Sequence, residues 1–132
     1  MINFEEILNG KVNGVLATID ENGPQTRIFQ SLWVENNKVY FCTGAQKDVY
    51  KQLVSNPNAS YCVENKFSPV LSVNGKVSFA EELEYKERAF EVLPMLKNLY
   101  QEPTNQNFKV FYIDIKQVKT FSYAEGPKEY KL

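Results

Sequence analysis

The stretch that decides the fold runs from residue 14 to residue 34 and reads GVLATIDENGPQTRIFQSLWV. A compact apolar run over residues 14–19 is followed by an Asn-Gly-Pro turn and by a second run of β-formers over residues 25–34. An Asn-Gly pair between two such runs is typical of a β-hairpin. A second turn at residues 35–37 and an aromatic, β-branched run at residues 38–43 predict a third strand, and therefore an antiparallel meander.

The remainder of the chain predicts both helices and strands. Helices are expected over residues 3–10, 46–55 and 81–100, the last of them kinked or split at Pro94, because proline breaks the helical hydrogen-bond pattern. Further strands are expected over residues 59–63, 70–79, 109–113 and 118–123, with a bend or bulge at Asn74-Gly75 and a solvated tail at residues 128–131. The sequence therefore predicts a single domain over residues 1–132, mainly β in an α+β arrangement: an antiparallel barrel of six or seven strands with two or three helices.

The composition excludes several kinds of chemistry. The 132 residues include no histidine and two cysteines, Cys42 and Cys62. Without an imidazole there is no Ser-His-Asp or Cys-His nucleophile, and no zinc, non-haem iron or haem ligated by histidine. Two cysteines cannot supply the four ligands of a structural zinc or iron–sulfur site. We therefore expect no metal site, and any chemistry must come from a carboxylate, a lysine, a tyrosine or a borrowed cofactor.

Charge and hydropathy limit the partners that we expect for this chain. A net charge of −1 gives no reason to expect binding to nucleic acid or to an anionic membrane. No apolar run approaches the roughly 18 residues that span a bilayer, and no signal-peptide segment opens the chain. We therefore expect a cytoplasmic protein with reduced cysteines. The aromatic content of 14% is high, and indicates a large β-rich core, an oligomer or a flat ligand.

Arg27 lies among aromatic residues on one face of the second predicted strand. Odd- and even-numbered residues of a strand point to opposite faces. We assign the mainly aliphatic even-numbered residues of 26–34 to the barrel interior. The odd-numbered face, with Arg27, Phe29 and Trp33, then suits a planar anionic ligand or another subunit. A solvated arginine on an amphipathic strand is the alternative.

A second candidate feature is the junction of strand and helix at residues 43–48. Free N–H groups and the positive end of the macrodipole make such a helix start an anion site, to which Thr43 adds a hydroxyl and Lys47 a mobile charge. The hairpin is expected to bring Thr43 alongside the preceding strand, so that a phosphate meets Arg27 and Lys47 together. A common turn followed by an exposed lysine is the alternative. The neighbouring Cys42 is either a reactive thiol or, more simply, a buried inert one.

Residues 14–63 resemble the FMN-binding split-barrel family, the pyridoxamine 5′-phosphate oxidase-like flavoproteins. An arginine-bearing strand, a strand that ends in Thr43, a Gly turn, a lysine-bearing helix and Asn56-Pro57 carry the resemblance, and later segments fit more loosely. The resemblance implies a split β-barrel homodimer with FMN at the subunit interface. It also implies which residues hold FMN: Arg27 and Lys47 the phosphate, Thr43 and Gln46 further hydrogen bonds, the backbone of Ile28, Phe29 and Gln30 the ring edge, and Cys42 the ribityl chain. A partner-subunit aromatic, Trp33 or Tyr123, would cover the ring.

The departures from the family pattern narrow the function. Pyridoxamine phosphate oxidases have an arginine-rich signature near the C-terminus, and no arginine follows Arg88 here. The chain is more similar to the short members related to nitroimidazole-resistance and general-stress proteins, and members that depend on histidine do not apply. The resemblance implies an FMN-dependent oxidoreductase acting on a small organic substrate, with no catalytic residue identified. Flavin binding or storage without turnover, a dimeric interaction module without cofactor, and a deazaflavin in place of FMN are the alternatives.

Overall fold

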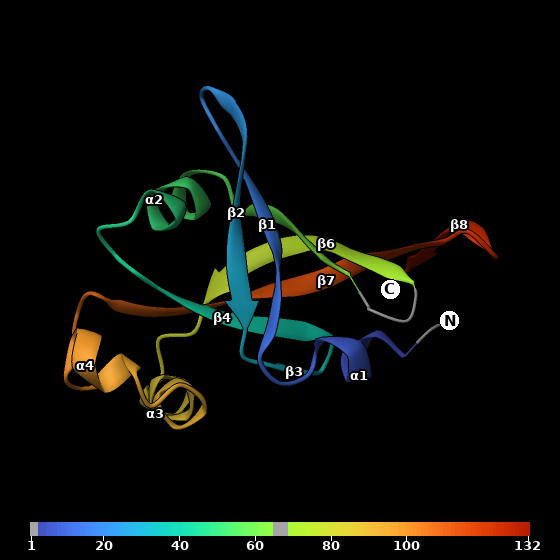
Figure 1. Ribbon diagram of the computed structural model, residues 1–132. Coiled ribbons are helices and arrows are strands. Elements are labelled where there is room, and N and C mark those ends of the chain that lie inside the picture. Colours follow the sequence, from blue (N-terminus) through green and yellow to red (C-terminus); the bar gives the residue numbers. More distant parts are fainter. Residues whose placement is uncertain (1–2, 65–68) are drawn as a thin grey trace.

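The computed structural model describes residues 3–64 and 69–132. In this part of the chain eight antiparallel strands form one sheet that curls into a half-barrel, in the order β2-β1-β5-β6-β7-β4-β3 with β8 paired to β7 (Figure 1). The strands are β1 (Val12–Asp20), β2 (Gly23–Ser31), β3 (Trp33–Glu35), β4 (Lys38–Gly44), β5 (Asn58–Glu64), β6 (Val70–Phe79), β7 (Phe108–Ser122) and β8 (Gly126–Lys131). The helices are α1 (Phe4–Leu8), α2 (Asp48–Ser55), α3 (Leu83–Val92) and α4 (Leu96–Tyr100). The predicted fold class is confirmed, with more strands and helices than expected.

The N-terminal hairpin forms where the Asn-Gly-Pro turn predicts it. β1 and β2 pair along their whole length, from Val12 opposite Ser31 to Asp20 opposite Gly23. The predicted strand over residues 25–34 is interrupted at Leu32, whose N–H donates to the carbonyl of Tyr40 (2.8 Å). Through this bond the end of β2 meets β4, the other side of the half-barrel.

The assignment of the two faces of this hairpin strand was wrong. Ile28 is 71% exposed, whereas Phe29 packs against the core. The register explains why: fully buried Leu16 of β1 lies opposite Arg27, and opposite residues share a face. The odd-numbered side of β2 therefore faces the barrel interior. Beyond Leu32 the chain has passed to β3, where the alternation no longer continues from β2.

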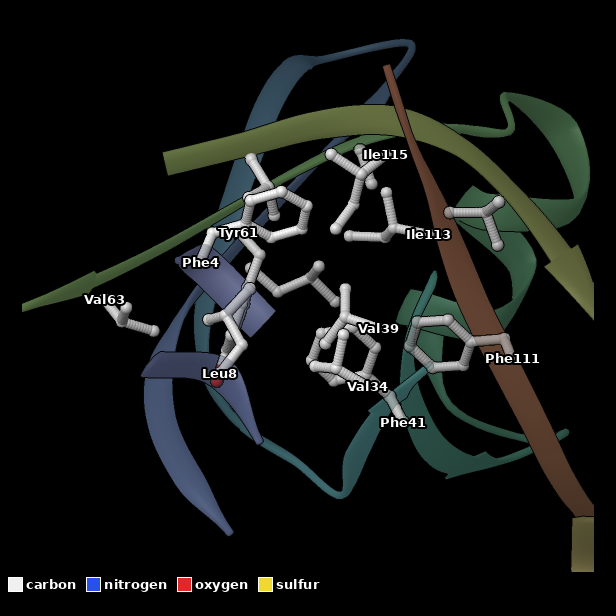
Figure 2. Close-up of a cluster of buried hydrophobic side chains, with 14 of the residues drawn as sticks. Phe4, Leu8, Val34, Val39, Phe41, Tyr61, Val63, Phe111, Ile113 and Ile115 are labelled. Carbon is white, nitrogen blue, oxygen red and sulfur yellow. The ribbon is translucent and has the colours of Figure 1, made fainter. Parts of the chain in front are cut away.

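The core consists of two clusters of buried side chains on the two faces of β4. The first fills the half-barrel, where Phe41 stacks on Phe111 with ring centroids 5.1 Å apart (Figure 2). Phe29 meets both rings edge-on. The second lies under α3 and α4 and contains Trp33 and Tyr40. Most of the unusual aromatic content is thus packed in the core.

The C-terminal third differs from the prediction in two places. Proline splits the long predicted helix into α3 and α4, as expected, but the two predicted strands over residues 109–123 form one 15-residue strand, β7. The expected tail at residues 128–131 is wrong, because these residues belong to β8. The reason is an open edge: β4 pairs with β7 only from Phe108 to Asp114, and β8 takes the positions from Gln117 to Ser122.

The predicted irregularity of β6 is confirmed. Its register against β7 shifts between Asn74 and Gly75. A Cβ on Gly75 would lie 2.0 Å from the carbonyl oxygen of Asp114, so the bulge requires glycine. None of the four described helices is long and apolar enough to cross a membrane.

Candidate functional site

Arg27 reaches from the inner face of β2 toward α2. Its Nη1 donates to the hydroxyl of Thr18 (2.8 Å) and to the carbonyl of Leu16 (3.3 Å), and its Nη2 donates to Oε1 of Gln52 (2.6 Å). In Figure 1, α2 lies beside the β1–β2 hairpin, as these bonds require. Arg27 is therefore a partly buried, fixed cation and not the solvated arginine of the alternative interpretation.

A neutral amide separates this guanidinium from the nearest acidic side chain. Oε1 of Gln52 also accepts from Thr18 Oγ1 (2.7 Å), while Nε2 of Gln52 donates to Oδ2 of Asp20 (3.1 Å). Within the described residues no carboxylate lies within 4.0 Å of Arg27. Burial lowers the pKa of Arg27, and the charges of Asp20 and Asp48 partly offset this effect. The guanidinium keeps its charge without a direct ionic partner.

The sequence analysis missed Thr18 and Gln52. Thr18 is a buried polar residue on the inner face of β1, and Gln52 lies on α2 next to the buried Leu53. Two signals could have pointed to them: a hydroxyl at an inward position of an apolar strand, and an amide four residues after Asp48 on the same helix face. Both become informative only when the distance between the hairpin and α2 is known.

The start of α2 presents backbone donors and a lysine. The helix begins at Asp48, two residues later than predicted, with Lys47 as N-cap and no side chain capping it. The preceding turn uses its own groups, since the N–H of Lys47 donates to the carbonyl of Gly44 (3.1 Å). No carboxylate of the described chain lies within 4.0 Å of Lys47. Uncapped first-turn N–H groups and the helix macrodipole favour an anion at this position.

Thr43 has a buried hydroxyl without a partner. The residue is 3% exposed, and its Oγ1 makes no hydrogen bond to any described residue. Leaving such a group unsatisfied costs about 1–3 kcal/mol. By alternation along β4, Thr43 lies on the same side as Phe41, the side of the barrel interior. An unsatisfied hydroxyl just before α2 fits a ligand that accepts a hydrogen bond there.

Gly44 and Gln46 pack closely in the same turn. A Cβ on Gly44 would lie 2.8 Å from the hydroxyl of Tyr100 and 2.9 Å from Oε1 of Gln46. The side chain of Gln46 therefore lies over Gly44, between β4 and α2. A larger residue at position 44 would displace the end of the Gln46 side chain from this position.

The side chain of Cys42 does not lie beside Thr43, Gly44 and Gln46. Its side chain belongs to the second cluster, on the other face of β4 from Thr43. Burial raises the pKa of the thiol to about 12, an effect that Lys47 partly offsets. The structure thus favours an inert thiol and does not bring the Cys42 side chain to Arg27.

The two aromatic candidates for covering a ring differ in accessibility. Trp33 is 2% exposed and stacks on Tyr40 (4.7 Å between ring centroids), with the guanidinium of Arg88 4.3 Å from its ring. Tyr123, in the turn between β7 and β8, is 99% exposed. Trp33 is part of its own chain's core, and Tyr123 alone of the two is free to contact a ligand or partner.

The backbone of Ile28, Phe29 and Gln30 lies on the terminal strand of the sheet order. In the described chain β2 forms ladder bonds with β1 alone. Alternate N–H and C=O groups of such a strand have no ladder partner, although the carbonyl of Phe29 accepts from the hydroxyl of Tyr61 (2.9 Å). A strand edge of this kind can hydrogen-bond a planar ring with polar edge atoms.

The predicted residues do not line the groove between β1, β5, β6 and β7. This groove, about 590 Å³ in volume, is lined by residues of these four strands and by Pro24 of β2, and none of Arg27, Thr43, Gln46 and Lys47 is among them. The structure thus brings Arg27 to α2, and places Thr43, Gln46 and Lys47 at the start of that helix. No three His, Cys, Asp or Glu side chains of residues 3–64 and 69–132 are grouped to hold a metal.

Comparisons with known proteins agree with this architecture. A sequence profile described as pyridoxamine 5′-phosphate oxidase matches residues 2–122. A NimC/NimA family protein from Clostridium acetobutylicum is 26% identical, with a TM-score of 0.83 over 98% of this chain and 91% of that one. General Stress Protein 26 from Bacillus anthracis str. Sterne is 20% identical, with a TM-score of 0.80 over 99% and 100%. An F420 reductase is 17% identical, with a TM-score of 0.69 over 89% and 97%.

These matches do not all support the same conclusion. The last two structures, below 25% identity, show likeness of fold alone. No protein of curated function matches the chain. The profile match, however, spans nearly the whole chain and agrees with the half-barrel of antiparallel strands. The chain therefore belongs to the pyridoxamine 5′-phosphate oxidase family.

Proposed function

We propose that the chain binds FMN, with the flavin phosphate at the start of α2, and acts as a flavin-dependent oxidoreductase on a small organic substrate. The observation that carries this proposal is Arg27, which has no carboxylate partner among the described residues. Its Nη2 lies 2.6 Å from Oε1 of Gln52, on the helix that begins at Asp48 without a side-chain cap. A phosphate monoester carries about two negative charges and accepts several hydrogen bonds, so it matches a fixed guanidinium, a mobile lysine and free N–H groups. Membership of the family supports the same cofactor.

Each residue has a defined part in this proposal. Arg27 and Lys47 hold the phosphate, and Thr43 and Gln46 donate further hydrogen bonds. The backbone of residues 28–30 orients the ring along the edge of β2. When bound, FMN supplies the electron-transfer chemistry, while the protein binds it, orients it and shapes the pocket. Cys42 has no chemical role in this proposal beyond lying near the ribityl chain, because its raised pKa keeps the thiol neutral.

The proposal includes a cytoplasmic homodimer with FMN between the subunits. Apolar side chains lie exposed on the outer face of the β1–β2 hairpin, where Val15 is the cross-strand partner of Ile28 and Ile19 lies four pairs further along on the same face. An exposed apolar row of this kind is typical of a surface that another subunit covers. Tyr123 of the β7–β8 turn is then the aromatic that a partner would place over the ring.

A second candidate function is flavin binding or storage without turnover. It is favoured by the shortage of acid–base groups: the chain has no histidine, and the Cys42 thiol beside Thr43 in the sequence is held neutral. The fold is also shared with an F420 reductase, so a deazaflavin is the alternative cofactor.

The visible spectrum of the purified protein tests the proposal. Protein incubated with FMN and then desalted is expected to keep flavin absorbance in a ratio of one FMN to each chain. A parallel incubation with F420 tests the deazaflavin. Anaerobic addition of NADH or NADPH, followed by a nitro or quinone acceptor, is expected to bleach and then restore the bands. Retained flavin that neither NADH nor NADPH reduces supports storage. A colourless protein contradicts flavin binding altogether.

A further inference from the structure

The side-chain amide of Gln52 lies between the guanidinium of Arg27 and the carboxylate of Asp20. We infer that Gln52 is a positioning residue that keeps Arg27 free of carboxylates, so that the guanidinium remains available to a phosphate. The inference rests on the proposed FMN site and deepens it, since it names what sets the preference of that site for a phosphorylated ligand.

The geometry fixes the orientation of the amide. Its oxygen accepts from Arg27 Nη2 (2.6 Å) and from Thr18 Oγ1 (2.7 Å), so this end must be the carbonyl. Its nitrogen faces Oδ2 of Asp20 (3.1 Å), which accepts a hydrogen bond and cannot donate one when ionised. Reversing the amide would place donor against donor and acceptor against acceptor, so only one orientation satisfies all three neighbours.

The amide also holds Asp20 in place. The other carboxylate oxygen, Oδ1, accepts from the N–H of Asn22 (2.8 Å) and from Nε2 of Gln25 (3.3 Å). Asp20 is thereby anchored in the β1–β2 turn. Its charge is close enough to raise the pKa of Arg27, yet the two side chains make no direct ion pair.

The arrangement matters because a salt bridge and a phosphate compete for the same N–H groups. An arginine paired with a carboxylate must lose that partner, or share it, when a phosphate binds. A neutral amide holds the guanidinium at one Nη group and leaves its net charge uncompensated. The site is therefore expected to prefer FMN strongly over riboflavin, which has the same ring and ribityl chain without the phosphate.

Gln52→Glu tests this with almost no change of shape. The new carboxylate still accepts from Arg27 and Thr18, but it pairs ionically with the guanidinium. We expect FMN to bind about tenfold or more weakly, with riboflavin affinity changed less than twofold, so the ratio of the two dissociation constants falls. Gln25→Glu is the matched control, because it adds the same charge beside Asp20 without touching the guanidinium with its side chain. Its ratio is expected to change by less than threefold.

A rescue experiment distinguishes positioning from a merely structural role. Gln52→Met removes the amide that holds Oδ2 of Asp20, so this oxygen can turn toward Arg27 while Oδ1 stays anchored in the turn. We therefore expect the preference for FMN over riboflavin to fall. Adding Asp20→Asn removes the competing charge but keeps an oxygen for Asn22, and is expected to restore the ratio to within about threefold of wild type. Circular dichroism and thermal unfolding identify any variant that fails to fold, and the remaining variants still decide the outcome.

The possible results separate the two levels of the argument. If wild type binds neither flavin, the proposed function fails. If wild type binds FMN but Gln52→Glu keeps the wild-type ratio, weakens both flavins equally or behaves as Gln25→Glu does, the role of Gln52 is overturned while the FMN site stands. Failure of Asp20→Asn to rescue Gln52→Met overturns it as well.

Discussion

At the scale of single residues, the buried hydroxyl of Thr43 makes no hydrogen bond to any described residue. Thr43→Val replaces it with a methyl group of nearly the same size. We expect the flavin-free protein to become more stable by about 1 kcal/mol, because an unsatisfied buried hydroxyl is removed. We expect FMN to bind about five- to tenfold more weakly, because a hydrogen bond to the ligand is lost. Urea unfolding and FMN titration measure the two effects.

The opposite signs make this prediction specific. Thr104→Val, at an exposed position between α4 and β7, is the matched control and is expected to change neither quantity. A loss of stability in flavin-free Thr43→Val would show that the hydroxyl already has a partner, and unchanged FMN affinity would remove Thr43 from the site.

The thiol of Cys42 makes stability depend on alkaline pH. Burial raises its pKa from an ordinary value near 9.0 to about 12 in the folded chain. Between these two values the unfolded chain releases a proton that the folded chain keeps, so the free energy of unfolding falls as pH rises through this range. Urea unfolding at pH 8 and pH 10.5 measures the loss, which Cys42→Ala should reduce. Equal losses in wild type and Cys42→Ala would contradict this account, and Cys62→Ala is the matched control.

The sequence alone could single out Arg27 as a candidate site residue, but not the hydrogen-bond partners that hold its side chain. A guanidinium between rings, and a lysine at the start of a helix after a glycine turn, are local patterns, so Arg27 and Lys47 could be predicted. Thr18 and Gln52 come from two other elements, and their role depends on a distance that no local pattern contains. The face of Arg27 was assigned wrongly because the break at Leu32 ends the alternation that the aliphatic residues suggested.

At the scale of secondary-structure elements, Gly75 allows the bulge of β6 to lie close to the backbone of β7. Gly75→Ala would place a methyl group 2.0 Å from the carbonyl oxygen of Asp114, a backbone atom that cannot turn aside. We expect a loss of more than about 2 kcal/mol in the free energy of unfolding, the range of overpacked sites. Urea unfolding checks it, with the exposed Ser78→Ala of the same strand as control. A loss below 0.5 kcal/mol would mean that the bulge adapts.

Elements bounded by glycine or proline signals could be predicted from the sequence. Elements that form only because a neighbouring strand lacks a partner could not. The Asn-Gly-Pro turn, the Asn74-Gly75 bulge and the split at Pro94 each follow from the backbone preferences of one or two residues. β8 begins with a turn signal, Gly126-Pro127, but the rest of its sequence is rich in charge and is typical of a solvated tail. It is a strand because β4 leaves the second half of β7 without a partner.

At the scale of the whole molecule, the proposed dimer makes the exposed hairpin face testable. Ile28→Glu puts a charge in the middle of the apolar row on β1 and β2. We expect the dimer dissociation constant, measured by analytical ultracentrifugation, to rise at least tenfold, because an unpaired charge would be buried. Leu99→Glu, at an exposed apolar position of α4, is the control and is expected to remain dimeric. A wild-type monomer, or a dimer unaffected by Ile28→Glu, would contradict this interface.

A fluorescence titration with FMN of wild type and Arg27→Ala tests the proposed site most directly. Wild type is expected to saturate at one FMN per chain. Arg27→Ala is expected to bind about 10- to 100-fold more weakly, since hydrogen bonds from a charged donor contribute roughly 1.5–3 kcal/mol. Riboflavin, which lacks the phosphate, is expected to bind both proteins alike. Wild type that does not saturate with FMN, or an Arg27→Ala variant that binds FMN as tightly as wild type, would contradict the account.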